Sequence, residues 1–206
     1  LVDMFENLTY DTIYHEHLSF LAIRPLMKLF EPFGLEIFDV EIHEVQGRSI
    51  RVFVGKQDRR NISPNIKNLA DKELSMGLDK PKSYQDLAQR VEEQKNKLTL
   101  LLKDLKYQGK KFAAYGAPAK GNTMLNYCGI GTEILDYALE DLPAKQGLFT
   151  PGMHIPTVDA VYAHSHEPDY YLMLAWNYEK PILEKEQKFL KNGGKFIVPV
   201  EGIRIV

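Results

Sequence analysis

The sequence has a single cysteine, Cys128, among its 206 residues. One cysteine excludes a disulfide within the chain and a zinc site made of cysteines alone. Neither sign of charge dominates, because 26 Lys and Arg residues stand against 28 Asp and Glu residues. A protein that binds nucleic acid through its phosphates needs a strongly basic face. We therefore expect no nucleic-acid partner.

Long apolar runs are also absent. No stretch approaches the ~20 apolar residues of a membrane span, so we expect no membrane contact. The chain begins with Leu1 and Val2, without an initiator methionine or the basic segment of a signal peptide. These features predict a fragment of a longer, cytoplasmic protein. The hydrophobic content of 44% and the charged content of 26% are ordinary for a globular protein, and no pattern predicts the oligomeric state.

The first part of the sequence predicts one helix followed by two strands. Apolar residues recur at helical spacing over residues 25–33, and Gly34 ends the pattern. Residues 35–42 and 50–54 alternate between apolar and polar side chains, which predicts two strands. The Gln46-Gly47 pair lies between them and favours a hairpin turn, so we expect the strands to be antiparallel.

The middle of the chain predicts two helices. Ser63-Pro64 is a helix start signal. Ser83 and Asp86 have the spacing of an approximate capping box, which would open a longer helix that ends at Gly109. This longer helix carries a leucine-rich stripe, which we interpret as packing against a core.

The remaining sequence alternates strands with helices. Residues 110–130 predict a strand, a Gly-rich turn and a helix, and residues 133–141 a second strand. Residues 169–176 are almost all apolar, as expected of a strand covered on both faces. Residues 177–200 predict a helix, a Gly-Gly stop and a final strand. This order implies a mostly parallel, Rossmann-like sheet with flanking helices, in an α/β chain that opens with a helix and an antiparallel strand pair.

The Gly-rich turn GAPAKGNT, residues 116–123, lies where a helix N-terminus could bind an anion. Its spacing imitates a P-loop, but Asn122 replaces the lysine that holds the phosphates, which argues against an ATPase or GTPase. Pro118 replaces the second glycine of a dinucleotide fingerprint. Glu140 and Asp141 follow at the distance of a ribose-binding acid. Contact with a nucleotide or phosphate and a tight structural turn both remain open.

A second polar segment follows the second strand of this region. Residues 141–160 include Lys145, Gln146 and His154 among several prolines and glycines. A loop at the carboxyl edge of a parallel sheet is a common ligand crevice. The alternative is a rigid connector that carries polar residues without binding anything.

The motif YHEH, residues 14–17, concentrates titratable groups in one short segment. In an extended conformation His15 and His17 point to one side and Glu16 to the other. The helical HExxH spacing is absent and a metal would need further ligands, so we expect no metal site. Imidazole titrates near neutral pH and can be oriented by a neighbouring carboxylate or tyrosine, which favours acid–base catalysis. Histidines that satisfy loop backbone groups are the alternative.

Three stretches together resemble one family. YDTIYHEHLSF (residues 10–20), YGAPAKGNTMLNYCGI (115–130) and DLPAKQGLFTPGMHIP (141–156), in this order and spacing, resemble the nucleotide-sugar C-methyltransferases. Members of this family use S-adenosylmethionine (SAM) to methylate a ring carbon beside the keto group of a dTDP-linked deoxysugar. They have an N-terminal zinc-binding domain, a middle SAM-binding domain and a C-terminal Rossmann-like domain.

The resemblance implies a domain division. Residues 1–56 would be the carboxyl end of a class I methyltransferase domain, residues 57–108 a helical linker and residues 109–206 a Rossmann-like substrate-binding domain. The zinc-binding cysteines and the Gly-rich SAM motif of the family have no counterpart here, so we expect the main SAM pocket upstream of Leu1 and an inactive isolated chain. The two glycines that family members usually have after the first hairpin strand appear here as Gln46-Gly47-Arg48, a mild change that weakens the case for a substrate contact at that turn.

The resemblance also implies roles for individual residues. His17 would be the base that removes the proton α to the ketone, and Tyr14 would hydrogen-bond the sugar or the developing enolate. Glu16 would orient a partner or bind a sugar hydroxyl, and His15 would be packed away. The residues expected on the nucleotide-sugar side of the cleft are Lys120, Asn122, Lys145, Gln146 and His154.

Two classes of function are therefore compared. The first is a fragment of a SAM-dependent sugar C-methyltransferase with a nucleotide-sugar substrate. The alternative is a non-catalytic module with a Rossmann-like fold that binds a nucleotide or nucleotide-sugar. The intact YHEH motif favours the enzyme. A dehydrogenase that uses NAD is disfavoured, because Pro118 interrupts the fingerprint and a second dinucleotide-binding half is missing.

Overall fold

The computed structural model describes residues 1–43 and 48–206, which form two compact units. The first unit comprises residues 1–6 and 18–90, and the second comprises residues 7–17 and 91–206. The second unit therefore includes the YHEH motif, although a long stretch of chain separates the motif from the rest of that unit. The predicted hairpin turn at Gln46-Gly47 lies outside the described residues.

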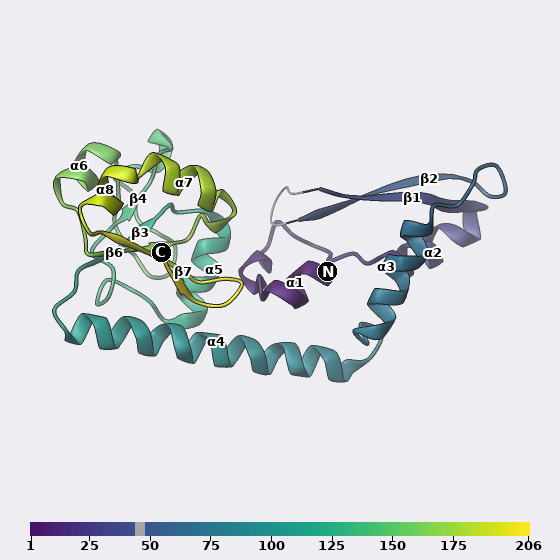
Figure 1. The fold of residues 1–206 in the computed structure, drawn as a ribbon, viewed down its shortest axis with the longest axis horizontal. Helices are drawn as coiled ribbons and strands as arrows, with labels where there is room; N and C mark the ends of the chain where they lie inside the picture. Colours follow the sequence, from purple (N-terminus) through teal and green to yellow (C-terminus); the bar gives the residue numbers. More distant parts are fainter. Residues whose placement is uncertain (44–47) are drawn as a thin grey trace. The chain divides into compact units, whose positions relative to one another are not determined.

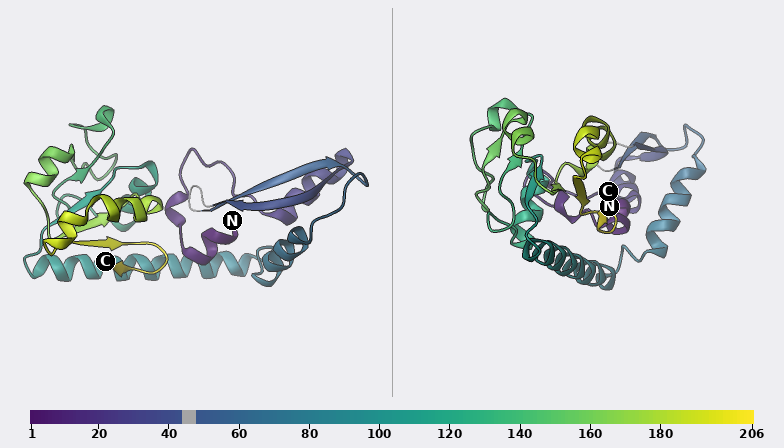
Figure 2. Two further views of the ribbon diagram at one scale, coloured as in Figure 1. Left: turned by 45° about the horizontal axis from the view of Figure 1, so that its top comes forward. Right: turned by 60° about the vertical axis from the view of Figure 1, so that its left-hand side comes forward.

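The first unit is built on an antiparallel strand pair. β1 (Leu35–His43) pairs with β2 (Ser49–Lys56), as predicted. The helices α2 (Ile23–Phe30) and α3 (Pro64–Ser75) both contact β1 and each other (Figures 1 and 2). The unit also contains α1 (Val2–Asn7) and the short helix η2 (Glu31–Phe33). Its small core consists of Ile23, Leu26, Ile37, Val40 and Ile66.

The start of α2 was predicted at Pro25, which is wrong by two residues. The helix begins at Ile23 because the buried carboxylate of Glu73 accepts the backbone N–H of Ile23 at 2.6 Å and that of Arg24 at 3.0 Å. Proline is tolerated in a first helical turn, where its missing N–H would have no partner within the helix. Gly34 follows η2 with a φ of 64°, a left-handed conformation that glycine adopts without strain.

The two middle helices differ in how well the sequence predicts their starts. Ser63 caps α3 as predicted, since its hydroxyl accepts the backbone N–H of Asn65. α4 (Pro81–Tyr107) begins before Ser83, so the capping box predicted there is wrong. The Ser83 hydroxyl instead donates to the carbonyl oxygens of the preceding turn. The interpretation of the leucine stripe is confirmed, because Leu98 and Leu102 are buried in the core of the second unit.

A six-stranded sheet organises the second unit, with the strand order β5-β4-β3-β6-β7-β8. Neighbouring strands are parallel except for β7 and β8, so the predicted mostly parallel sheet is confirmed. The bounds are β3 (Phe112–Tyr115), β4 (Ala138–Leu139), β5 (Thr157–Val158), β6 (Tyr170–Met173), β7 (Lys195–Val198) and β8 (Arg204–Ile205). The two-residue strands β5 and β8 were not predicted.

Helices cover both faces of this sheet. α6 (Ala160–Ser165), α7 (Glu179–Lys185) and α8 (Gln187–Lys191) lie on one side, and α5 (Ala119–Cys128) lies on the other with part of α4 (Figure 1). The remaining short helices are η1 (Tyr10–Thr12), η3 (Pro143–Lys145) and η4 (Trp176–Tyr178). Across residues 1–43 and 48–206, no helix is sufficiently long and apolar to cross a bilayer.

The sheet order creates a point where ligands commonly bind. From β3 the chain continues to β4 on one side, whereas β6 lies on the other side of β3. Ligands of open α/β sheets bind at such a reversal, outside the carboxyl ends of the strands. The residues that follow β3, β4 and β6 are therefore the natural place to look for a binding site.

Candidate functional site

The YHEH motif follows η1 in a turn that is closed by its own backbone. The N–H of His17 donates to the carbonyl oxygen of Tyr14 at 2.9 Å, and the N–H of Tyr14 donates to that of Thr12 at 3.1 Å. The rings of Tyr14 and His17 lie with their centroids 4.4 Å apart. His15 and Glu16 are exposed, whereas Tyr14 and His17 are half-buried. The turn therefore separates the motif into two inner and two outer side chains.

The imidazole of His17 is held in one tautomer. Its Nδ1 lies 2.8 Å from the carbonyl oxygen of Thr12. A carbonyl can only accept a hydrogen bond, so Nδ1 carries the proton and Nε2 carries the basic lone pair of the neutral ring. This arrangement suits a general base, because the second nitrogen is oriented while the first stays protonated.

The phenol of Tyr14 is poised as a donor. Desolvation raises its pKa, and the negative charges of Glu16 and Asp11 raise it further. The hydroxyl therefore stays protonated over the whole range in which an imidazole titrates. His15 is predicted to be packed away, but the structure leaves its side chain exposed.

Behind the turn lies a buried polar cluster in the same unit. The indole Nε1 of Trp176 donates to Asp11 Oδ2 at 2.6 Å. The Lys120 ammonium lies 3.6 Å from the centroid of the Trp176 ring and donates to Asn177 Oδ1 at 2.6 Å. Next to Asp11 in the sequence, the Tyr10 hydroxyl shares a hydrogen bond of 3.4 Å with the Cys128 thiol. η1 is thus attached to both α5 and η4.

Burial dominates the electrostatics of this cluster. Desolvation raises the pKa of Asp11 to about 6, although the hydrogen bond from Trp176 and the charge of Lys120 both lower it. Desolvation likewise lowers the pKa of Lys120 to about 8, against the attraction of Asp11. Burial also raises the pKa of Tyr10. Each of the two opposite charges favours the ionised form of the other, against the desolvation of both.

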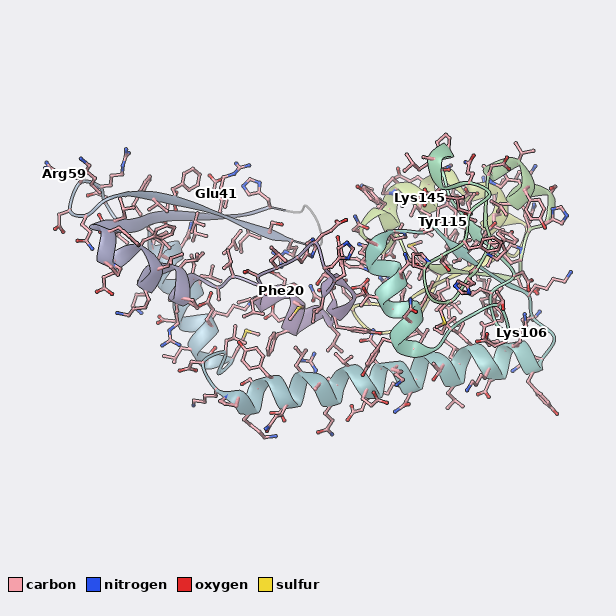
Figure 3. All side chains as sticks on the ribbon, turned by 180° about the vertical axis from the view of Figure 1, so that it is seen from behind. Phe20, Glu41, Arg59, Lys106, Tyr115 and Lys145 are labelled. Carbon is pink, nitrogen blue, oxygen red and sulfur yellow. The ribbon has the colours of Figure 1, made fainter. Side chains whose placement is uncertain are left out.

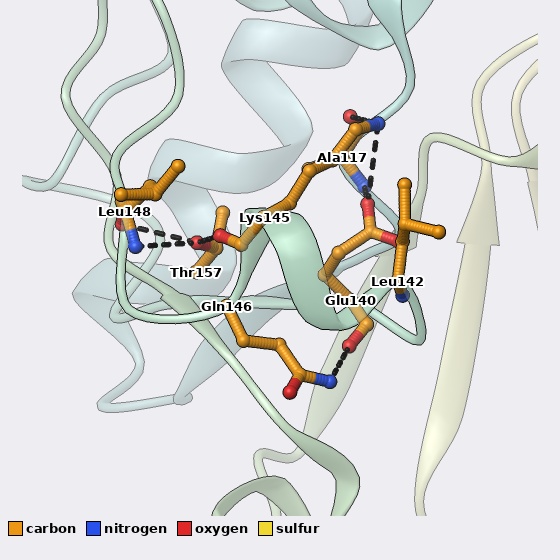
Figure 4. A network of polar contacts seen from close by, with 7 residues as sticks. All are labelled: Ala117, Glu140, Leu142, Lys145, Gln146, Leu148 and Thr157. Carbon is orange, nitrogen blue, oxygen red and sulfur yellow. Dashed lines mark hydrogen bonds and ion pairs between the residues drawn. The ribbon is translucent and has the colours of Figure 1, made fainter.

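The Gly-rich turn after β3 is held in place by hydrogen bonds to the Glu140 carboxylate (Figure 4). One carboxylate oxygen of Glu140 accepts the N–H of Ala117 at 3.1 Å and the other accepts that of Leu142 at 2.9 Å. The Lys145 ammonium donates to the Ala117 carbonyl oxygen at 3.0 Å and lies 3.6 Å from the Glu140 carboxylate. Gln146 donates to the Glu140 carbonyl oxygen at 2.8 Å. These contacts favour the structural interpretation of the turn.

A cavity of about 290 Å³ opens at the carboxyl ends of the strands. Its walls come from the segments that follow β3, β4 and β6, where the sheet order predicts a ligand. Tyr115 and Lys145 both line it and lie near one another in Figure 3. Gly116 adopts a φ of 83°, and a Cβ there would lie 2.9 Å from the Ala175 Cβ. The turn can therefore close against Ala175 only with glycine at this position.

The predicted substrate-binding residues are distributed over several places. Lys145 and Gln146 meet at Glu140, whereas Lys120 points to Trp176. Asn122 lies in the first turn of α5, and its buried Oδ1 accepts no hydrogen bond from any described residue. His154 is exposed, with a left-handed φ of 52°. Within residues 1–43 and 48–206, no three His, Cys, Asp or Glu side chains form a group that could hold a metal ion.

The acids that follow β4 already have partners within the protein. A ribose is bound by an acid whose oxygens are available to its hydroxyls. Both oxygens of Glu140 already accept backbone N–H groups, and Asp141 forms an exposed ion pair with Lys185 at 2.8 Å. Pro118, at the N-cap of α5, has no N–H to offer a ligand. The acids that the sequence suggested for a ribose are thus engaged within the protein.

Sequence reasoning missed the cluster around Trp176. Asp11 and Tyr10 are adjacent to the YHEH motif, but nothing in the sequence pairs them with residues 128 and 176. One signal was available: Trp176 is the single tryptophan of the chain and lies three residues after the end of the apolar strand β6. Residues at the carboxyl end of a parallel strand commonly belong to a functional site.

Comparison with known proteins agrees with the resemblance seen in the motifs. Residues 44–201 match the family model described as the C-methyltransferase C-terminal domain. The match covers more than half of the chain. The chain belongs to the C-methyltransferase C-terminal domain family.

A curated relative extends the similarity to the amino-terminal residues. The chain is 37% identical to the C-methyltransferase NovU of Streptomyces niveus over 207 residues, which are 100% of this chain and 49% of NovU. The chain thus spans about half the length of this relative. The YHEH motif precedes the matched range of the C-methyltransferase C-terminal domain model but lies within the region similar to NovU.

Proposed function

We propose that this chain is the carboxyl-terminal part of a SAM-dependent C-methyltransferase. Its reaction would methylate a carbon α to a ketone on a nucleotide-linked sugar. The family membership and the similarity to NovU support the reaction class. The observation that carries the assignment of the base is the 2.8 Å contact between His17 Nδ1 and the Thr12 carbonyl oxygen.

The proposed role of His17 follows from this contact. Removal of a proton α to a ketone needs a base that is neutral near the operating pH. Nε2 of His17 takes the proton, while Nδ1–H stays bound to the Thr12 carbonyl oxygen. The imidazolium that forms is then stabilised by the same carbonyl dipole that fixed the neutral ring.

Tyr14 and Glu16 complete the proposed catalytic residues. The Tyr14 hydroxyl remains protonated and can donate a hydrogen bond to the developing enolate oxygen, which is where a donor lowers the barrier most. Glu16 is exposed and would bind a sugar hydroxyl or orient a partner. His15 has no role in this proposal.

The nucleotide-sugar would bind to residues 109–206. Residues 1–56 would form the carboxyl end of the methyltransferase domain, and the helical segment 57–108 would join these two parts. Lys145 lines the cavity at the carboxyl ends of the strands, and Gln146, Asn122 and His154 are further candidates for the same ligand. The main SAM pocket would lie upstream of Leu1. The isolated chain would then be inactive, and the whole protein would act in the cytoplasm.

The test separates proton removal from methyl transfer. The enzyme that contains this chain is incubated with a dTDP-linked keto-deoxysugar in deuterated water, and incorporation of deuterium at the α carbon is followed by NMR. We expect His17→Asn to slow this exchange by roughly 10²–10⁴-fold, the usual contribution of a general base. His15→Asn is the matched control and should leave the exchange rate close to that of the parent.

A non-catalytic binding module is the second candidate, and the cavity at the strand ends favours it. In that case His17→Asn would leave both deuterium exchange and methyl transfer unchanged. That result would contradict the proposed base and leave nucleotide binding as the function of the second unit.

A further inference from the structure

Three segments of the second unit meet at Trp176. Asp11 belongs to η1, Lys120 to the first turn of α5 and Trp176 to η4. All three side chains are buried, with exposed fractions of 0% for Asp11, 9% for Lys120 and 7% for Trp176. We call this set the Trp176 bridge. The indole edge contacts the acid at 2.6 Å, and the ring face contacts the ammonium at 3.6 Å from its centroid.

The two contacts of the indole reinforce each other. A cation over the ring face attracts π electrons, which makes the N–H a stronger donor to the Asp11 carboxylate. The carboxylate at the N–H edge in turn makes the ring face more attractive to the Lys120 ammonium. The indole N–H is the side-chain donor to the Asp11 carboxylate, and the backbone N–H groups of Asp11 and Thr12 also face it. Removal of one member would leave a buried charge without compensation.

The Trp176 bridge is adjacent in sequence to the group that holds His17. Asp11 precedes Thr12, whose carbonyl oxygen accepts from His17 Nδ1 and from the N–H of Tyr14. The Thr12 hydroxyl donates to the Thr9 carbonyl oxygen at 2.7 Å, which makes this short segment stiff. A displacement of Asp11 would therefore move the Thr12 carbonyl and change the hydrogen bond to His17.

We propose that Asp11, Trp176 and Lys120 are positioning residues that hold the Thr12 carbonyl in place and thereby keep His17 in the tautomer with a basic Nε2. This inference rests on the proposed function, which makes His17 the base. It assigns Lys120 a role inside the protein in place of the substrate contact that the sequence suggested. The three residues act through His17 and do not touch the substrate.

The test reads the His17 tautomer directly in the 206-residue chain. Long-range ¹H–¹⁵N NMR spectra distinguish a ring protonated at Nδ1 from one protonated at Nε2. In the parent we expect His17 to be protonated at Nδ1. In Asp11→Ala and Trp176→Phe we expect the ¹⁵N shifts to move toward those of the Nε2–H tautomer.

Two further variants separate positioning from loss of stability. Phe189 is buried in α8 and packs on Tyr171 and Phe196, so Phe189→Leu weakens the same unit without touching the Trp176 bridge. It should leave the His17 tautomer unchanged. Asp11→Asn keeps an acceptor for the indole N–H and should preserve the parent tautomer even if Asp11→Ala does not fold.

The NMR and exchange experiments distinguish a failure of the positioning proposal from a failure of the proposed base. The proposal is overturned if Trp176→Phe folds and keeps His17 protonated at Nδ1, or if Phe189→Leu changes the tautomer equally. If the tautomer responds as expected but His17→Asn retains deuterium exchange, the positioning holds and the proposed base fails. In the whole enzyme, Trp176→Phe should lower kcat by about 100-fold with little change in KM, the cost of a base displaced by about 1 Å.

Discussion

At the scale of single residues, the second unit keeps an acid and an amine in an environment that disfavours both charges. Burial raises the pKa of Asp11 to about 6 and lowers that of Lys120 to about 8. The groups that face Asp11 are Lys120 on α5, Trp176 on η4, and Tyr10 and Tyr14 from its own segment. At neutral pH both charged forms reduce the stability of this unit, which natural proteins accept mainly where the charges serve a function.

The raised pKa of Asp11 predicts a pH dependence of stability. The folded state binds the Asp11 proton more tightly than the unfolded state does, so the free energy of unfolding decreases as the pH rises from about 4 to about 6. A shift of this size corresponds to about 3 kcal/mol. Asp11→Asn should remove this decrease. Urea unfolding followed by Trp176 fluorescence at several pH values measures both proteins.

Asp136→Asn is the control for this measurement, because Asp136 is half-exposed in its ion pair with Lys106. Its pH profile should follow that of the parent. Equal pH profiles for the parent and Asp11→Asn would contradict the prediction.

At the scale of elements, local sequence patterns predict what an element is better than where it starts. The periodicity of α2, β1 and β2 is local and was read correctly, because apolar side chains must recur on the buried face. The start of α2 depends on Glu73, fifty positions later, which no local pattern contains. β8 is only two residues long, Arg204–Ile205, and too short for any alternation to show.

The dependence of α2 on Glu73 can be measured. Glu73→Ala leaves the buried N–H of Ile23 and the part-buried N–H of Arg24 without an acceptor, and we expect it to lower the free energy of unfolding of the first unit by about 2–3 kcal/mol. Glu73→Gln keeps one acceptor and should cost roughly half of that. The circular dichroism transition should move to lower urea, while the Trp176 fluorescence transition, which reports the second unit, stays in place.

Asp71→Asn on the same helix is the matched control. Asp71 forms an exposed ion pair with Lys67, so the change should cost less than about 1 kcal/mol. A Glu73→Ala variant as stable as Asp71→Asn would show that the buried carboxylate does not determine the start of α2.

At the scale of the whole molecule, the sequence predicts the fold class but not which distant residues meet. The alternation of strands and helices after residue 110 was sufficient to predict the parallel sheet. The contact between Asp11 and Trp176 joins positions 165 residues apart and leaves no periodic signal. The position of Glu140 after β4 made it a candidate to bind a ribose. Its observed partners could not be predicted, because they depend on the conformation of the loop around Lys145.

Calorimetric titration tests the expected division of labour between cofactor and substrate. We expect dTDP to bind the 206-residue chain and SAM not to bind it. Ala175 lines the cavity at the strand ends, so Ala175→Leu should fill part of it and weaken dTDP binding at least tenfold. Val161 on α6 is 80% exposed, and Val161→Leu should bind dTDP as the parent does. Binding of SAM alone would contradict the proposed location of the cofactor pocket.

The second unit is assembled from two separate pieces of chain, residues 7–17 and 91–206. A chimaera that exchanges only the later piece between two relatives would join the acid of one protein to the indole and amine of the other. The sheet could fold normally in such a hybrid while the YHEH turn lost its support. The smallest part of this protein that can be exchanged between relatives is therefore discontinuous. Residues 7–17 must be exchanged together with residues 91–206.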